Sequence, residues 1–240
     1  MLERKIRSIV KACSWFLLGV FVLIVISFFT TRSVKQVCVI TILYYFIRFV
    51  SFYMHERLWL RIKWGKTDGL VIWFTGLPCS GKTTLAIALQ KKLIKLGYKV
   101  ERLDGDIIRK TPLSSDLSFT KEDREKHLRR IGVLAHFLSK NGIIVLCSFV
   151  SPYRKIRKEL RQFVHNFVEV YVKCSKKECI RRDVKGLWKK ALKGEIQHFT
   201  GVSDIYEHPI KPDVTVDTEH TSVEECVNKI YKALKRKKLL

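Results

Sequence analysis

The fold of this sequence is decided by one stretch, Gly76-Leu77-Pro78-Cys79-Ser80-Gly81-Lys82-Thr83, which fits the pattern GxxxxGK[ST] at every fixed position. The apolar run Leu70–Phe74 leads directly into it, and a strong helix predicted over Thr83–Leu96 follows. In such a strand–loop–helix unit, backbone N–H groups converge on phosphates and the helix N-terminus adds partial positive charge. The stretch therefore predicts a P-loop, which binds the phosphates of a nucleotide.

Each part of this loop has an expected role in binding ATP and Mg²⁺. Lys82 is expected to reach the β- and γ-phosphates, and Thr83 to offer its hydroxyl to Mg²⁺. Cys79 is expected to fill a tolerated side-chain position rather than to act as a nucleophile or sensor. The predicted ATP contacts come from Gly76, Leu77, Pro78, Cys79, Ser80, Gly81, Lys82, Thr83 and Thr84.

From Leu70 onward, short β-rich runs alternate with longer amphipathic runs. This alternation predicts an α/β domain over residues 67–240, a P-loop NTPase-type parallel sheet with helices on both faces. The predicted strands are Leu70–Phe74, Val100–Asp104, Ile143–Phe149, Glu169–Lys173 and Val214–Asp217. The predicted helices include Thr83–Leu96, Lys121–Lys140, Tyr153–Phe163 and Ser222–Leu239.

Residues 1–66 show a different pattern, two apolar segments over Ala12–Thr31 and Val37–Met54, the second interrupted only by Arg48. About 20 apolar residues cross a bilayer as a helix, so two transmembrane helices are predicted. A signal peptide is the alternative for the first segment. Its long apolar run, the missing small-residue cleavage pattern and the second run argue against that. We therefore expect residues 1–66 to form a membrane anchor.

The basic residues that flank these segments predict the orientation of the anchor. Four Lys or Arg precede the first segment, four follow the second, and two lie between them. The positive-inside rule then places both ends of a helical hairpin in the cytoplasm. A single span would put the following domain outside, away from ATP. We expect a multi-pass membrane protein whose termini and catalytic domain are cytoplasmic.

The net charge of +24 divides into +9 for residues 1–66 and +15 for residues 67–240. Nucleic acid, anionic lipid and polyanionic substrates are the three kinds of partner that such a charge attracts. The run Lys235–Lys238 is interpreted as a solvated tail, with contact to an anionic surface as the alternative. The seven cysteines form no CxxC pair, so we expect reduced thiols.

A second motif follows the predicted strand Val100–Asp104, where the sequence reads Leu103-Asp104-Gly105-Asp106. Side chains at the carboxyl ends of parallel strands point into the crevice that binds ligands. Asp104 or Asp106 could hold Mg²⁺, with Asp106 expected as the ligand beside Thr83. Either could instead accept the proton of an attacking hydroxyl, and a simple strand-end turn is the remaining alternative.

Five ordered blocks then give the chain a recognisable pattern over about residues 70–212: GLPCSGKTT, LDGDIIR, LSFTKEDREKHLRRIG, SFVSPYR and KGLWKKALKGEIQHFTGV. In this order and at these intervals they resemble the adenylylsulfate kinases. The resemblance implies transfer of the ATP γ-phosphoryl group to the ribose 3′-hydroxyl of adenylylsulfate, with Lys82, Asp104, Asp106 and Ser151 as catalytic residues. The apolar N-terminal segments lie outside the resemblance.

The resemblance also implies an acceptor site. Phe119 and Phe199 match two aromatic residues that stack on the adenine, and Arg109 and Arg130 match arginines that grip the phosphosulfate. Arg154 would lie near the same anion, and Lys185 belongs to a basic, glycine-containing mobile lid over 185–202.

Ser151 matches a serine described in the family as a phosphoserine intermediate. Direct in-line transfer needs no such intermediate. Ligation of phosphate or capping of the following helix are therefore the other interpretations of this residue.

Some positions depart from the family pattern on the acceptor side, namely Ile107, Ser118 and His127. A related membrane-anchored kinase with another nucleotide or sugar acceptor, for example for surface-polysaccharide modification, is therefore the alternative function. A non-catalytic nucleotide-binding scaffold is a further alternative, which the intact Asp pair argues against. A homodimer is possible. No nucleic acid is expected, because no recognised binding module accompanies the charge.

Overall fold

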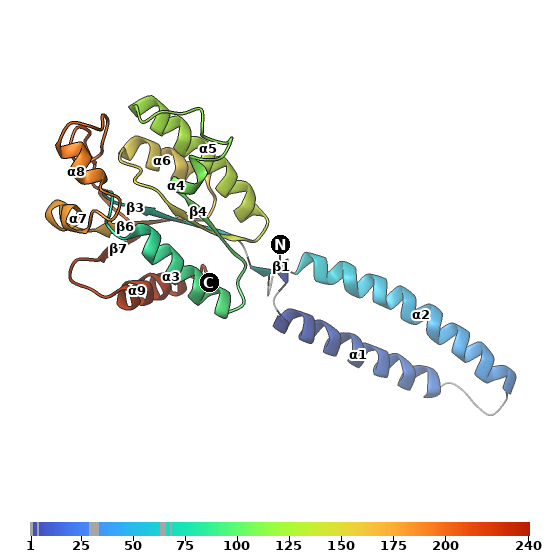
Figure 1. Cartoon of the computed structure of the whole chain (residues 1–240). Helices are drawn as coiled ribbons and strands as arrows, with labels where there is room; N and C mark the ends of the chain where they lie inside the picture. Colours follow the sequence, from blue (N-terminus) through green and yellow to red (C-terminus); the bar gives the residue numbers. More distant parts are fainter. Residues whose placement is uncertain (1, 4, 29–33, 63–65, 68) are drawn as a thin grey trace. The chain divides into compact units, whose positions relative to one another are not determined.

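The computed structural model describes residues 2–3, 5–28, 34–62, 66–67 and 69–240 (Figure 1). The chain divides into two compact units, Leu2–Thr67 and Asp68–Leu240, each considered separately below. This division falls one residue from the domain boundary predicted from the sequence.

The first unit consists of two long helices, α1 (Lys5–Phe28) and α2 (Val34–Arg61). The short strands β1 (Leu2–Glu3) and β2 (Lys66–Thr67) pair antiparallel next to them. The two helices contact each other through polar side chains as well as aromatic rings. In one polar contact, Lys11 Nζ lies 2.7 Å from Glu56 Oε1. Many apolar side chains on these helices are exposed, among them Phe16, Phe21, Ile42 and Phe49.

The two predicted transmembrane segments thus fall on helices, although α1 begins before Ala12 and α2 continues past Met54. Residues 29–31 of the first predicted segment lie outside the described residues. Within the described part of the chain, no helix has the length and apolar content needed to cross a membrane.

The second unit is built on a five-stranded parallel sheet in the order β4-β5-β3-β6-β7. Its strands are β3 (Leu70–Thr75), β4 (Val100–Asp104), β5 (Ile144–Ser148), β6 (Phe167–Lys173) and β7 (Val214–Asp217). The register pairs Ser148 with Phe74 on one side and with Asp104 on the other. This register sets the end of β4 level with the start of the P-loop, with the end of β5 between them.

Helices cover both faces of the sheet, as the alternation of strands and helices predicts (Figure 1). On one face α3 (Lys82–Lys95) and α9 (Val223–Arg236) pack on Ile72 and Phe74. On the other face α5 (Lys121–Lys140) and α6 (Arg154–Phe163) pack on Val71 and Trp73. Successive residues of β3 therefore serve opposite cores, which is why the run is apolar throughout.

The predicted strands and long helices are confirmed to within a few residues at their ends. Three short helices are absent from the prediction, namely α4 (Gly105–Ile108), α7 (Lys176–Arg182) and α8 (Leu187–Leu192). Each has at most seven residues, too few for the apolar periodicity on which a prediction depends. All three lie around the carboxyl end of the sheet.

Candidate active site

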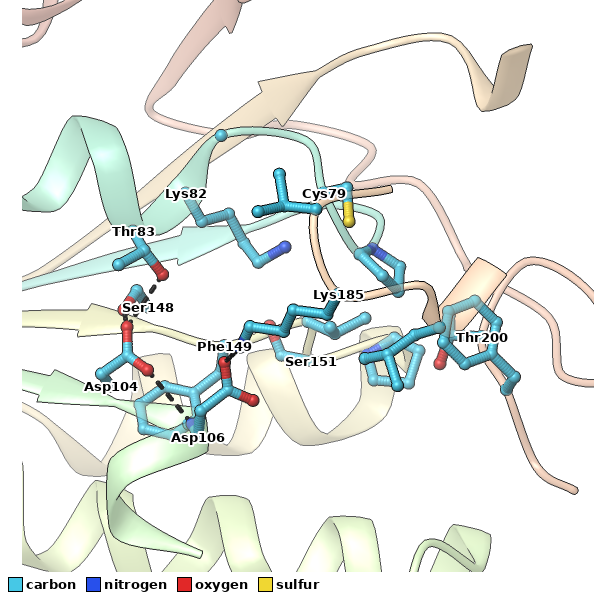
Figure 2. A pocket seen from close by; sticks show the side chains of 18 of the residues that line it. Cys79, Lys82, Thr83, Asp104, Asp106, Ser148, Phe149, Ser151, Lys185 and Thr200 are labelled. Carbon is cyan, nitrogen blue, oxygen red and sulfur yellow. Dashed lines mark hydrogen bonds and ion pairs between the residues drawn. The ribbon is translucent and has the colours of Figure 1, made fainter. Parts of the chain in front are cut away.

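A cleft of about 750 Å³ opens at the carboxyl end of the sheet (Figure 2). Its lining comes from the P-loop, the end of β4, the loop after β5, and the segment around α8. Ligands of open parallel sheets bind at this end, because the loops that follow the strands converge there. The sequence motifs therefore meet in one cavity, although they are up to 120 residues apart.

The P-loop wraps around the ammonium group of Lys82. Lys82 is 8% exposed, and its Nζ donates hydrogen bonds to the carbonyl oxygens of Gly76 and Leu77, at 3.1 and 2.6 Å. Burial lowers the pKa of Lys82 to about 8. Gly81 adopts a φ of +94°, a conformation that glycine tolerates and other residues rarely adopt, at the point where the loop turns into α3.

Asp104 is the centre of a hydrogen-bond network on the other side of this lysine (Figure 2). Its Oδ2 accepts from the hydroxyls of Thr83 and Ser148, at 2.8 and 2.9 Å, and its Oδ1 accepts from the backbone N–H of Asp106 at 3.1 Å. Burial opposes ionisation of this carboxyl, but these hydrogen bonds and Arg102 hold its pKa below the usual value. Asp104 is therefore an ionised, fixed carboxylate beside the P-loop threonine.

Asp106 lies in a different environment, since its side chain is 66% exposed and forms an ion pair with Lys185 (Figure 2). The pair raises the pKa of Lys185. The predicted lid residue and the predicted second carboxylate thus meet across the mouth of the cleft. Asp104, rather than Asp106, is the carboxylate that contacts Thr83.

The far part of the cleft contains the predicted aromatic residues Phe119 and Phe199. Phe119 is 53% exposed, and the guanidinium carbon of Arg109 lies 4.2 Å from its ring centroid. Phe199 is held by an edge-to-face contact with Trp188, with ring centroids 5.0 Å apart. An exposed ring and a braced ring in one cavity are suited to holding a planar ligand between them.

Arg130 and Arg154, which were also predicted to bind the acceptor, lie outside the lining of the cleft. The guanidinium of Arg130 donates to both carboxylate oxygens of Asp116, at 2.6 and 2.9 Å, and does not line the cleft. Arg154 donates from Nε to the carbonyl oxygen of His208 and likewise lies outside the lining. Their roles in binding an acceptor anion stay predictions, and both would require these contacts to open.

Ser151 lines the cleft but is engaged in the core. Its Oγ accepts a hydrogen bond from Trp73 Nε1 and donates one to Thr75 Oγ1, each at 3.0 Å. Its φ of +40° is unusual for a residue with a side chain and costs about 1–3 kcal/mol. The serine therefore connects the loop after β5 to the centre of the sheet.

Sequence reasoning missed Arg124, which lines the cleft and lies over Phe119, with its guanidinium carbon 5.4 Å from the ring centroid. A signal was present, because Arg124, Leu128 and Ile131 share one helical face through spacings of four and three residues. His127 also lines the cleft and is 3% exposed. Burial and the nearby arginines lower its pKa to about 4, so the imidazole is neutral at pH 7.

Comparison with known proteins identifies the family. The family model described as "Adenylylsulphate kinase" matches residues 68–217, which is more than half of the chain. This chain belongs to the adenylylsulphate kinase family. A relative from Aeropyrum pernix named "Probable adenylyl-sulfate kinase" is 51% identical over 171 residues, which are 70% of this chain and 93% of that protein.

Other members of the adenylylsulphate kinase family also match this chain in sequence and in structure. The adenylyl-sulfate kinase of Rippkaea orientalis is 51% identical over 169 residues, 70% of this chain and 93% of its own length. The structure of the Mycobacterium tuberculosis APS kinase in complex with AMPPNP and APS superimposes with a TM-score of 0.68 at 36% identity. That match covers 70% of this chain and 99% of the other.

The N-terminal unit has a match of its own. Residues 9–60 match a family described as "Predicted membrane protein (DUF2061)". The chain therefore joins an adenylylsulphate kinase unit to a segment that the two relatives named above do not share, since their matches leave about 30% of this chain uncovered.

Proposed function

We propose that this chain transfers the γ-phosphoryl group of ATP to the ribose 3′-hydroxyl of adenylylsulfate, giving 3′-phosphoadenylylsulfate. The observation that carries the proposal is the cleft itself. Its lining combines the P-loop residues Lys82 and Thr83 with the aromatic pair Phe119 and Phe199. The carboxylates Asp104 and Asp106 line the same cleft. Relatives at about 50% identity bear the name of this activity.

The nucleotide half of the cleft fits Mg·ATP. The loop amides and Lys82 would hold the phosphates, and the hydroxyl of Thr83 with the carboxylate of Asp104 forms an oxygen set suited to Mg²⁺. When bound, Mg²⁺ would neutralise charge on the β- and γ-phosphates. The hydroxyl oxygen of Thr83 and Oδ2 of Asp104 lie 2.8 Å apart, close enough for both to contact one ion.

The acceptor half of the cleft would orient adenylylsulfate for the transfer. The adenine would lie between Phe119 and Phe199, and Arg109, stacked on Phe119, would face the phosphosulfate. Asp106 would orient the 3′-hydroxyl and accept its proton, because Asp104 already accepts from four donors while Asp106 is exposed at the cleft mouth. Release of Lys185 from Asp106 would free that carboxylate and bring the lysine to the phosphates.

The function is tested by supplying the full chain with Mg·ATP and adenylylsulfate and measuring 3′-phosphoadenylylsulfate. We expect product with adenylylsulfate and little with adenosine monophosphate, because the sulfate-free nucleotide lacks part of the anion that Arg109 would bind. Phosphorylation of another nucleotide or a sugar in place of adenylylsulfate would overturn the proposal. Hydrolysis of ATP without any acceptor product would overturn it as well.

Phe199→Ala should raise the acceptor KM by about 10- to 100-fold and leave the KM for ATP nearly unchanged. Loss of one stacking face costs about 1–3 kcal/mol, or roughly one to two decades. Phe137→Ala, which removes an exposed ring on α5 outside the cleft, is the matched control. Initial rates over both substrate concentrations measure the effect. A rise in the KM for ATP instead would show that Phe199 contacts ATP and not the acceptor.

We propose further that residues 1–66 anchor the enzyme in a membrane through two spans, with residues 67–240 in the cytoplasm. The match to a predicted membrane protein over residues 9–60, the exposed apolar side chains of α1 and α2, and the basic flanks support this.

Removal of residues 1–66 should release an active kinase from the membrane fraction into the soluble fraction. Protease added outside sealed cells should leave the catalytic unit of the full chain intact, because that unit is expected on the inner side. Cell fractionation and immunoblotting measure both results. A truncated kinase that stays with the membrane after a salt wash would argue against the hairpin as the principal anchor. Cleavage of the catalytic unit by external protease would show the opposite orientation.

A further inference from the structure

The amino end of the sheet, opposite the cleft, carries a second distinctive surface. Helices α3, α5, α6 and α9 each begin near the carboxyl end of the sheet and run back, so their last turns lie where the strands begin. The exposed residues of these turns are called the basal surface below. It consists of Ile94, Lys95, Leu96, Phe137, Phe163 and Lys235 and the exposed basic residues near them in the chain.

The basal surface is strongly basic. Residues 90–99 contain four Lys, residues 229–240 contain six Lys or Arg, and neither segment contains Asp or Glu. The two segments lie together, because Lys92 donates to Asn228 Oδ1 and lies 4.8 Å from the ring centroid of Tyr231. The charge of these two segments is therefore concentrated in one place, and none of their residues lines the cleft.

Large apolar side chains are exposed at the same end of the sheet. Ile94, Leu96, Phe137 and Phe163 are each between 50% and 58% exposed, at the ends of three different helices. Phe137 and Phe163 both contact His136, with ring centroids 5.8 and 4.7 Å apart, so they form one aromatic cluster. Ile94 and Leu96 alternate with lysines in residues 90–99. Lysines beside exposed apolar side chains are typical of surfaces that lie in the headgroup region of a bilayer.

The chain also enters the catalytic unit at this end. Gly69 packs against the backbone of Ser139 in the last turn of α5, close enough that a Cβ on Gly69 would clash with it. The carbonyl oxygen of Gly69 accepts a hydrogen bond from Asn166 Nδ2 at 3.0 Å, just before β6 begins. The segment that precedes this point in the chain is therefore joined to the amino end of the sheet and not to the cleft.

We propose that the basal surface docks the catalytic unit on a bilayer that contains anionic phospholipids, with the cleft facing away from the lipid. The lysines would contact lipid phosphates, and the exposed apolar side chains would enter the interface. This inference rests on the membrane location proposed above but not on the identity of the acceptor. A second copy of the chain covering the same surface is the alternative that the experiment must separate.

The test is hydrogen–deuterium exchange on the full chain in vesicles of phosphatidylcholine alone or of phosphatidylcholine mixed with phosphatidylglycerol. We expect slower exchange in residues 90–99 and 229–240 in the anionic vesicles. The protection should be lost at about 0.5 M NaCl, where screening is strong. The α7–α8 segment, at the other end of the sheet, should exchange equally in both. Equal exchange of the basal segments in both lipids, or protection that follows protein concentration in the neutral vesicles, would overturn the proposal.

Charge reversal gives a second measurement. Lys95→Glu, Lys99→Glu and Lys235→Glu combined should lower partition of residues 68–240 onto anionic vesicles by at least about 100-fold, since each lysine near such a surface contributes about fivefold. This unit is a fair probe, because relatives consist almost entirely of it. The control carries the same charge change at exposed positions toward the other end of the sheet, Lys155→Glu, Lys176→Glu and Lys177→Glu. Equal partition of the two variants would refute the proposal.

Kinase activity in the same samples separates this inference from the proposed function. Both triple variants should keep the wild-type rate in solution, because none of the six lysines lines the cleft. If adenylylsulfate is not phosphorylated but lipid binding behaves as expected, the acceptor proposal fails and the docking surface stands. If catalysis is normal and the basal variant binds lipid like the wild type, the docking surface fails.

Discussion

Lys82→Ala should lower the rate of phosphoryl transfer by about 10²- to 10⁵-fold. Lys82 is the buried cation of the P-loop, and its ammonium is already within the loop that will hold the phosphates. Charge that develops on the transferring group would lose its nearest fixed cation. Removal of one such group costs about two to five decades in comparable sites. Single-turnover measurements at saturating Mg·ATP report the chemical step directly.

The control for this substitution is Lys91→Ala, which removes an exposed lysine near the other end of the same helix. It should retain the wild-type rate. Thermal unfolding of both variants checks that the fold is kept, since Lys82 also donates hydrogen bonds to two loop carbonyls. Product formation by a folded Lys82→Ala protein at a rate close to wild type would refute the assignment of the phosphate site.

Asp104→Asn should lower kcat by about 10²- to 10³-fold and raise the concentration of Mg²⁺ needed for half-maximal rate. The amide has nearly the same shape but no charge, and its nitrogen cannot accept a hydrogen bond. In one orientation the hydroxyls of Thr83 and Ser148 lose their acceptor, and in the other the backbone N–H of Asp106 loses its acceptor. Both the proposed oxygen ligand for Mg²⁺ and the arrangement of Thr83 would be impaired.

The matched control is Glu101→Gln, which changes an exposed residue of the same strand. It should keep the wild-type kcat and Mg²⁺ dependence. A Mg²⁺ titration of the rate distinguishes loss of metal binding from loss of folding. An unchanged Mg²⁺ dependence in Asp104→Asn would exclude this carboxylate from the metal site. Asp106, predicted as the metal ligand from the sequence, would then be the next candidate.

Local patterns made the core of the catalytic unit predictable. The apolar run before Gly76 and the amphipathic run after Lys82 define β3, the P-loop and α3, because each pattern is completed within a few residues. The alternation of strands and helices along the chain also predicts that helices cover both faces of the sheet. What could not be predicted was which of two carboxylates faces Thr83, since Asp104 ends the strand, Asp106 comes two residues later, and only tertiary contacts separate their roles.

The acceptor side was less predictable for a physical reason. Arginine has a long side chain with five donors, and helical spacing predicts the face on which it lies but not the partners that it contacts. Arg130 pairs with Asp116 away from the cleft, while Arg124, which lies in the same sequence block but was assigned no role, lies over Phe119 inside it.

The contacts of Lys82 imply that ATP binding is linked to protons. The ammonium of Lys82 has three donors, and the phosphates of ATP would compete for them with the carbonyls of Gly76 and Leu77. The contribution of Lys82 to ATP affinity is therefore the free energy of its phosphate contacts minus that of the carbonyl contacts that they replace. Because the pKa of Lys82 is about 8, a growing fraction of the protein carries a neutral lysine as the pH rises above that value. A polyanion that favours the charged form draws a proton from solvent as it binds. We therefore expect nucleotide affinity to fall as the pH rises above about 8, with a proton taken up on binding and a heat of binding that depends on the ionisation enthalpy of the buffer.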